Sequence, residues 1–161
     1  FSLHALKHGA IETVGIDQSA SALHLAADNA KRNNLGPSRG ILGSAFETLA
    51  ELVKTGEKFG LIVLDPPKFA RSRSAIEEAI KGYRKLNTLG LKLLEPGGFL
   101  VTCCCSGLIT MDMMEQILAL VGADEKRDIQ VLQRRGPSPD HPVAATCLES
   151  HYLKCLITRV M

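Results

Sequence analysis

Hydrophobic positions follow two patterns that alternate along the chain. Apolar residues spaced three or four positions apart predict helices, and short continuous apolar runs bounded by polar or glycine-rich segments predict buried strands. The helical runs cover residues 2–8, 20–33, 46–53, 76–94 and 110–120, and the strand-like runs cover residues 13–16, 40–42, 59–64, 99–102, 129–132 and 152–160. Ser19, a capping box at residues 74–77 and Thr110 are predicted helix starts, and Gly122 is a predicted helix end.

Strands separated by helices predict an α/β fold with a mostly parallel sheet and right-handed crossovers. A polar loop at residues 134–150 replaces the helix between the last two strands, so we expect those strands to be antiparallel neighbours. A length of 161 residues suits one core, and we predict a single domain over 1–161. Residues 1–9 lack an initiator Met and resemble the end of an amphipathic helix, which predicts a fragment of a longer protein.

Composition narrows the function classes. Hydrophobic residues make up 45% and charged residues 22%, as in soluble globular proteins, and no apolar run approaches the roughly 18–20 residues that would predict a membrane helix. The lack of Trp and the 4% aromatic content argue against broad stacking platforms for single strands, while a net charge of +2 permits an RNA partner. Five Cys, three of them adjacent and none in a C-x-x-C pair, predict no disulfide framework and no structural zinc site, and favour a reducing, cytoplasmic setting.

Residues 65–69, Asp-Pro-Pro-Lys-Phe, directly follow the apolar run 61–64. Pro fixes φ and has no N–H, so the strand ends there. Asp65 should therefore lie at the carboxyl end of a strand, the edge where open α/β sheets bind ligands. A planar base could lie against the prolines and Phe69 while Asp65 contacts its polar edge. The alternative is a strand-ending turn with a capping acid.

Two other strand ends carry candidate chemistry. Asp17 follows the run 13–16 and precedes a capped helix, so its carboxylate could either accept hydrogen bonds from two ribose hydroxyls or cap the helix. Residues 102–107, Thr-Cys-Cys-Cys-Ser-Gly, end the strand 99–102, and alternation directs Cys103 and Cys105 to one face and Cys104 to the other. Cys105 should lie beside Asp65, where a thiolate could attack an electrophilic carbon. Burial as a small hydrophobic residue is the alternative, and we favour it for Cys103 and Cys104.

Other polar residues are weaker candidates. Lys68, Arg71 and Arg73 flank the proposed pocket and could neutralise phosphates or form a solvated face. Glu149 and the histidines of the late loop qualify as general bases by residue type alone.

Taken together, these segments resemble class I S-adenosylmethionine-dependent methyltransferases, and more narrowly the bacterial 23S ribosomal RNA cytosine-5 methyltransferase family. Members of that family carry a PUA domain ahead of the catalytic domain. The resemblance runs in order over nearly the whole chain. The matching stretches are Val-Gly-Ile-Asp at 14–17, Asp-Asn at 28–29, Asp-Pro-Pro-Lys-Phe at 65–69, Gly-Tyr at 82–83, Pro-Gly-Gly at 96–98, Cys-Ser-Gly at 105–107, His-Pro at 141–142 and Tyr-Leu-Lys at 152–154.

The resemblance implies a Rossmann-like sheet with a C-terminal antiparallel strand, S-adenosyl-L-methionine as cofactor, no metal, and methylation of carbon 5 of a cytosine in large-subunit ribosomal RNA. The cofactor-binding residues that it implies are Asp17, Gln18, Ser44, Ala45, Asp65 and Pro66. The substrate-binding residues that it implies are Pro67, Lys68 and Phe69. It makes Cys105 the nucleophile at carbon 6, with Asp65 on the ring nitrogen. A looser similarity to uracil-5 methyltransferases suggests Glu149 as the base. The target base must be unstacked to be reached.

Two departures from the family and two alternative functions accompany this prediction. The family's first strand and glycine-rich loop are expected upstream of residue 1, and Ser44 stands where an acid is usual.

A methyltransferase acting on a guanine nitrogen or an exocyclic amine shares the Asp-Pro-Pro turn but needs no nucleophilic Cys. A non-catalytic RNA-binding domain is the second alternative. The sequence leaves the modified nucleotide and the oligomeric state open.

Overall fold

The computed structural model describes residues 1–161, apart from the side chain of Leu148. The chain forms two compact units, residues 1–54 and 55–161. Each unit has its own hydrogen-bonded sheet: β1–β2 in the first, and the order β3–β4–β6–β5 in the second. The predicted α/β fold class with an antiparallel C-terminal strand is confirmed, although its strands fall into two sheets.

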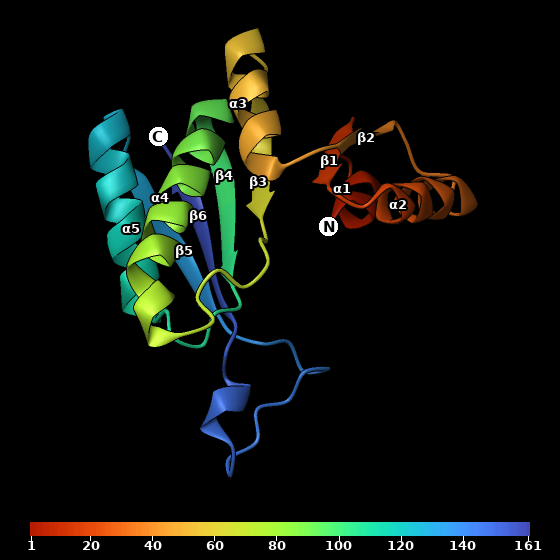
Figure 1. Cartoon of the computed structure of the whole chain (residues 1–161). Coiled ribbons are helices and arrows are strands. Elements are labelled where there is room, and N and C mark those ends of the chain that lie inside the picture. Colours follow the sequence, from red (N-terminus) through yellow and green to blue (C-terminus); the bar gives the residue numbers. More distant parts are fainter. The chain divides into compact units, whose positions relative to one another are not determined.

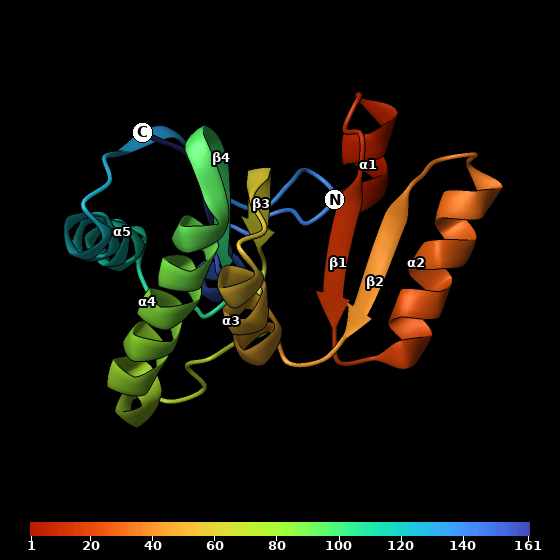
Figure 2. The same cartoon turned by 90° about the horizontal axis from the view of Figure 1, so that it is seen from above.

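The first unit is built on two parallel strands, with a helix packed along them (Figure 2). Its elements are α1 (Ser2–Lys7), β1 (Thr13–Asp17), α2 (Ala20–Arg32) and β2 (Ser38–Leu42), and α3 (Ala45–Thr55) leads into the second unit. Ser19 begins α2 as predicted, because its Oγ accepts a hydrogen bond from Ala22 N. The strands pair so that Asp17 lies opposite Leu42, which places the two carboxyl ends side by side.

The second unit is a four-stranded sheet with two helices against it (Figure 1). Its elements are β3 (Phe59–Leu64), η1 (Arg73–Ala75), α4 (Ile76–Leu93), β4 (Leu94–Cys104), α5 (Met111–Glu125), β5 (Ile129–Arg135), η2 (Leu148–Ser150) and β6 (Lys154–Val160). Strands β3 and β4 are parallel, and β6 runs antiparallel to both β4 and β5, as the missing helix between the last two strands predicts. The carboxyl ends of β3, β4 and β5 therefore share one edge, where β6 begins.

The core of the second unit lies between the sheet and helices α4 and α5. Gly90 of α4 brings the helix close, since a Cβ there would lie 3.1 Å from Leu64 Cδ1 and 3.5 Å from Leu100 Cδ1. On the opposite face Leu61 is 48% exposed and Phe99 is 41% exposed. The alternation along the strands therefore buries one face fully and leaves the other partly apolar and open.

Two predicted helix boundaries are wrong. The box at residues 74–77 does not cap α4, whose N-cap is Ala75, because a 3₁₀ turn precedes the helix and Ser74 Oγ instead hydrogen-bonds Ser72 Oγ. Gly122 does not end α5, which continues to Glu125 and stops at Lys126 in the left-handed conformation, φ 54°. A Cβ on Gly122 would lie 2.8 Å from the Arg127 carbonyl oxygen, so close packing explains the glycine.

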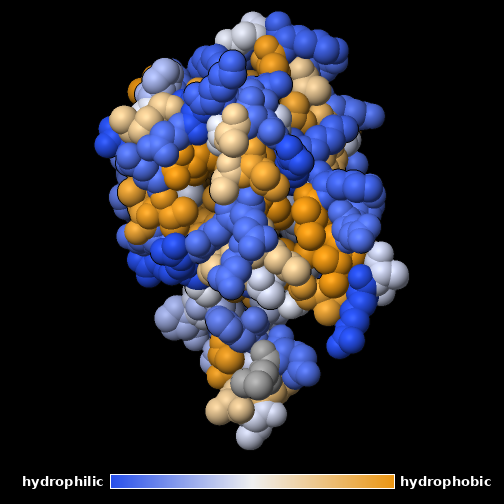
Figure 3. All heavy atoms as spheres, turned by 90° about the vertical axis from the view of Figure 1, so that its left-hand side faces the viewer, coloured by the Kyte–Doolittle hydropathy of each residue, from blue (hydrophilic) through white to orange (hydrophobic). Residues whose placement is uncertain are grey.

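The surface is mixed in character. Figure 3 shows the side with α5, where hydrophobic patches interrupt hydrophilic ones. Leu120 of α5 is 49% exposed, and Leu132, at the irregularity in β5, is 50% exposed. None of the helices that the structure describes has the length and apolar character needed to cross a membrane.

Candidate active site

The turn after β3 and the turn after β4 meet at one edge of the sheet. Leu64 pairs with Thr102 in the parallel β3–β4 ladder, so the residues that follow each strand emerge side by side. The Cys105 thiol donates a hydrogen bond to the Pro66 carbonyl oxygen, with 3.8 Å between sulfur and oxygen. Cys105 is partly exposed and Asp65 is exposed. The structure thus brings together the thiol and the Asp-Pro-Pro turn that the sequence singles out.

Ser106 anchors the turn that carries Cys105. The residue is fully buried, and its Oγ accepts a hydrogen bond from Ala70 N at 3.2 Å and lies 3.4 Å from Tyr83 Oη. Its carbonyl oxygen accepts a hydrogen bond from Lys154 Nζ at 2.6 Å. Contacts from the loop after β3, from α4 and from β6 therefore converge on one serine.

Ser106, Tyr83 and Lys154 were given no role in the site from the sequence, although each lies in a stretch that carries the family resemblance. One signal was present for the lysine: Lys154 begins the strand whose positions 156, 158 and 160 face the core, so alternation puts a charge among buried residues. A charge on the core face of a strand needs a specific partner. Nothing in the sequence identified that partner.

Phe69 packs inward against α4. Its ring centroid lies 4.7 Å from that of Tyr83, and a Cβ on Gly82 would lie 3.2 Å from the Phe69 ring. Gly82 therefore leaves room for the ring, which holds the loop after β3 on the helix. Pro67 and Lys68 of the same loop are exposed and available to a substrate.

The surroundings of Cys105 disfavour its thiolate. Burial raises the pKa of the thiol, and the neighbouring Cys104 and Asp65 charges raise that pKa further. The Lys68 ammonium acts in the opposite direction. A nucleophilic Cys105 thus depends on nearby positive charge to hold its ionised form.

A second thiol pair lies across β4 and β6. Cys103 and Cys155 are directly opposite in the antiparallel ladder. The hydrogen bond from Cys103 lowers the pKa of Cys155 to about 7, and the Arg135 charge lowers it as well, against the effect of burial. The same pairing raises the pKa of Cys103, which stays a thiol. All five cysteines are free.

The predicted cofactor residues of the first unit lie together at the carboxyl ends of β1 and β2. Asp17 is exposed, its Oδ1 accepts a hydrogen bond from Ser19 N at 2.7 Å, and Gly43 N bonds to its carbonyl oxygen at 3.0 Å. Gln18 follows β1, and Ser44 and Ala45 follow β2. Within the described residues no contact occupies the second carboxylate oxygen of Asp17, so the group fits a ligand with hydroxyl donors. Helix capping uses only one oxygen.

Glu149 lies apart from Cys105 in the network of contacts. It is exposed in η2, and its Oε2 accepts a hydrogen bond from the Cys147 thiol at 3.6 Å. No contact given by the described residues joins it to Cys105 or Asp65. Its loop connects β5 with β6 and leaves the sheet at the edge that holds Cys105, as the pairing of Cys104 with Lys154 requires.

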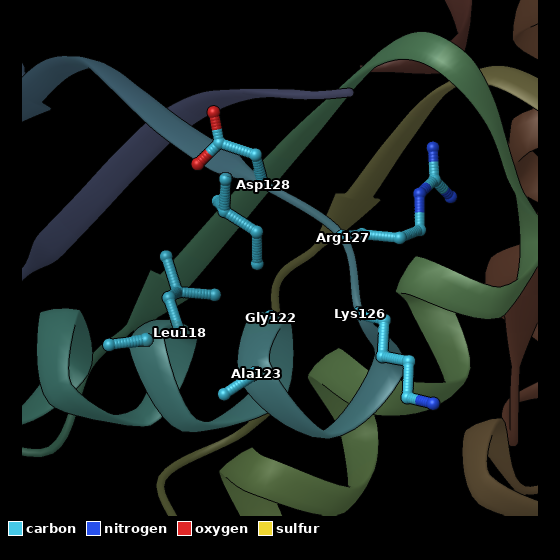
Figure 4. Close-up of a pocket in the computed structure, with 8 residues that line it drawn as sticks. Leu118, Gly122, Ala123, Lys126, Arg127 and Asp128 are labelled. Carbon is cyan, nitrogen blue, oxygen red and sulfur yellow. The ribbon is translucent and has the colours of Figure 1, made fainter.

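A hollow elsewhere in the second unit has a structural explanation (Figure 4). It has a volume of about 460 Å³ and is lined by the end of α5 and the start of β5. This is the opposite edge of the sheet from Cys105. Arg127, on its border, donates hydrogen bonds to the Leu91 and Leu94 carbonyl oxygens and so ties down the end of α4. Among the described residues no group of three His, Cys, Asp or Glu side chains could hold a metal ion.

Comparison with known proteins places the fold. No protein-family model matches the chain. In solved structures, the chain resembles SMU.776, a candidate methyltransferase crystallised with SAH, with a TM-score of 0.83 and 21% identity over 98% of this chain and 41% of that one. The chain has the α/β Rossmann-like fold of that protein.

Sequence relatives agree with this fold. The chain is 40% identical over 163 residues to the ribosomal RNA large subunit methyltransferase I of Tolumonas auensis, covering 100% of this chain and 41% of the relative. It is 42% identical over 161 residues to the protein of the same name from Aeromonas salmonicida, covering 99% of this chain and 41% of the relative. The chain thus spans about two fifths of the length of these relatives.

Proposed function

We propose that this chain is the catalytic part of an S-adenosyl-L-methionine-dependent methyltransferase that modifies carbon 5 of a cytosine in large-subunit ribosomal RNA in the cytoplasm. The observation that carries the proposal is the Cys105 thiol against the Pro66 carbonyl at adjoining strand tips. The 40% identity to relatives named for large-subunit ribosomal RNA methylation supports the substrate class. The likeness to a fold crystallised with SAH supports the cofactor.

The residues of the first unit suit the cofactor's nucleoside. Asp17 would accept hydrogen bonds from the two ribose hydroxyls, and Gln18, Ser44 and Ala45 lie beside it at the same strand ends. Ser44 offers a hydroxyl in place of the usual carboxylate, so we expect a weaker polar contact there. Asp65 and Pro66, which follow β3, are the other residues that we propose for cofactor binding. When bound, S-adenosyl-L-methionine supplies an electrophilic methyl group on a sulfonium sulfur.

Cys105 provides the covalent chemistry that carbon 5 of cytosine requires. Its thiolate adds to carbon 6, a carbon–sulfur bond forms, and carbon 5 becomes electron-rich. Bound S-adenosyl-L-methionine would supply the methyl group that this electron-rich carbon 5 accepts. A base then removes the carbon 5 proton, the carbon 5–carbon 6 double bond re-forms, and the thiolate leaves. For the addition, the carboxyl group of Asp65 would have to carry a proton and donate it to the ring nitrogen, which is an acceptor, and take it back when the thiolate leaves. Glu149 is our candidate for the base that removes the carbon 5 proton.

Glu149 must approach the base for this role, since its present contact is with Cys147. We expect the loop between β5 and β6 to bring it to the base when RNA binds. Lys68 and the exposed Pro67 lie on the side of the turn that RNA would contact, while Phe69 holds the turn on α4.

The test uses the full-length protein, purified large-subunit ribosomal RNA and isotope-labelled cofactor. Mass spectrometry of the nucleosides should find 5-methylcytidine with the wild-type protein and none with Cys105→Ala. The matched control is Cys147→Ser, which also removes a thiol but keeps a donor for Glu149, and it should retain activity. RNA carrying 5-fluorocytosine should form a covalent complex with the wild-type protein only, because fluorine at carbon 5 blocks the proton removal that releases the enzyme.

Methylation that survives Cys105→Ala, at a guanine nitrogen or an exocyclic amine, would replace this proposal with the alternative enzyme. Failure of the wild-type protein to bind the cofactor in calorimetry would favour the non-catalytic RNA-binding domain.

A further inference from the structure

Lys154 is a buried cation at the edge of the sheet that holds Cys105. The residue begins β6 opposite Cys104, and only 7% of its surface is exposed. Its Nζ donates hydrogen bonds to the Ser106 carbonyl oxygen at 2.6 Å and to the Tyr152 carbonyl oxygen at 2.7 Å. A buried ammonium is costly unless it is hydrogen-bonded, and two carbonyl acceptors meet that need.

The bond from Lys154 acts on the residue directly after Cys105. Cys105 lies between the end of β4 and Ser106, and Ser106 is also held through its side chain by Ala70 N. With its carbonyl fixed by Lys154 and its hydroxyl fixed by the loop after β3, Ser106 has little freedom. The backbone of Cys105 is therefore held at both ends.

Lys154 also interacts electrostatically with Cys105. Burial lowers the pKa of the lysine, while the charges of Cys104 and Cys105 raise it. The attraction between ammonium and thiolate is mutual, so Lys154 favours the ionised form of Cys105. The other charged groups that act on Cys105 are Cys104 and Asp65, which oppose ionisation, and Lys68, which favours it.

The two lysines differ in their surroundings. Lys68 is exposed, so solvent and salt screen its effect on the thiolate. Lys154 is buried and its charge is screened much less. Tyr83, whose burial and contact with Cys104 raise its pKa, remains a neutral phenol beside Ser106 and does not offset that charge.

We propose that Lys154 is a positioning residue for Cys105: its buried ammonium holds the Cys105–Ser106 turn through the Ser106 carbonyl and stabilises the Cys105 thiolate. The inference rests on the proposed function only in taking the Cys105 thiolate to be the nucleophile. The coupling between the two side chains is testable without RNA or cofactor.

The experiment measures iodoacetamide alkylation of Cys105 against pH in the full-length protein, resolved by residue with mass spectrometry. Lys154→Gln keeps a donor for the carbonyls and loses the charge, and Lys154→Met loses both. We expect each variant to raise the pH midpoint of Cys105 alkylation by about one unit, which slows alkylation about tenfold near neutral pH. Lys154→Arg keeps the charge, and its midpoint should stay near that of the wild type.

Two controls separate this effect from general damage. Lys81→Met removes an exposed lysine of α4 that pairs with Glu78, and should leave the midpoint unchanged. Cys103 is 5% exposed and should stay unlabelled wherever β4 and β6 remain paired. If Cys103 becomes labelled in Lys154→Gln and Lys154→Met, the result for Lys154→Arg decides. A Cys105 midpoint raised by about one unit in Lys154→Arg, despite the retained charge, overturns the proposal, and an unchanged Cys105 midpoint supports it.

An unchanged midpoint in a folded Lys154→Gln protein overturns the proposal outright. The proposed function fails separately, through methylation that survives Cys105→Ala. A shifted midpoint together with surviving methylation would keep the lysine–thiolate coupling and discard the covalent mechanism.

Discussion

Removing the Ser106 hydroxyl should destabilise the second unit by about 1–3 kcal/mol. Ser106→Ala leaves Ala70 N without its acceptor at 3.2 Å, and both residues are fully buried. An orphaned buried donor costs about 1–3 kcal/mol. The contact with Tyr83 Oη at 3.4 Å adds less, because that distance is long for a hydrogen bond between hydroxyl groups.

The assay is urea unfolding followed by circular dichroism, together with residue-resolved amide hydrogen exchange. Ser74→Ala is the matched control, since it also deletes a serine hydroxyl that makes a hydrogen bond, here to Ser72 Oγ at an exposed position. It should cost no more than about 0.5 kcal/mol. Exchange at Ala70 should accelerate in Ser106→Ala more than exchange in the core of β4. A loss in Ser106→Ala as small as that of the control, with Ala70 still protected, would refute the claim that this serine anchors the turn.

Three further predictions concern packing and ionisation. Gly122→Ala should destabilise the protein by about 1–2 kcal/mol in urea unfolding, because the added Cβ would lie 2.8 Å from the Arg127 carbonyl oxygen. Gly15→Ala, with open space around it, should not show this packing cost. Equal losses of stability in the two variants would contradict the packing argument. Cys155 should be alkylated with a pH midpoint near its pKa of about 7, while the buried Cys103, whose pKa is raised, should stay unlabelled. Cys103→Ala should raise the Cys155 midpoint by removing the hydrogen bond, and an unmoved midpoint would contradict the pairing. Hydrogen bonds from Arg134 lower the pKa of Glu115, so the stabilisation by this ion pair is present above the unfolded-state pKa of the carboxyl and is lost as pH falls through the lower folded-state pKa. The wild type should therefore lose more unfolding free energy than Glu115→Gln between pH 7 and about pH 3. Parallel plots of unfolding free energy against pH for the two proteins would contradict the ion pair.

Local sequence features determined the strand ends that make up the site. An apolar run followed by Asp65 and two prolines can only stop, because proline cannot continue a strand ladder. The run before Asp17 is closed by a helix start, because Ser19 caps α2, and Thr110 caps α5 in the same way. These features act over a few residues, and parallel strands bring their carboxyl ends to one edge. The juxtaposition of Cys105 with residues 65–66 therefore follows from local signals and a topology rule.

Contacts set by strand register could not be predicted in this way. The partner of Lys154 is the carbonyl of residue 106, 48 positions away, and Cys103 faces Cys155 only because β4 and β6 pair with that alignment. Gly122 has the sequence signature of a helix end, yet the approach of the chain at Arg127 explains it. Hydrophobic pattern and turn chemistry thus determined where each strand ends and which residues meet at the sheet edge. Only the tertiary structure decided which buried groups partner them, because burial makes distant hydrogen bonds and charges strong enough to select a single arrangement.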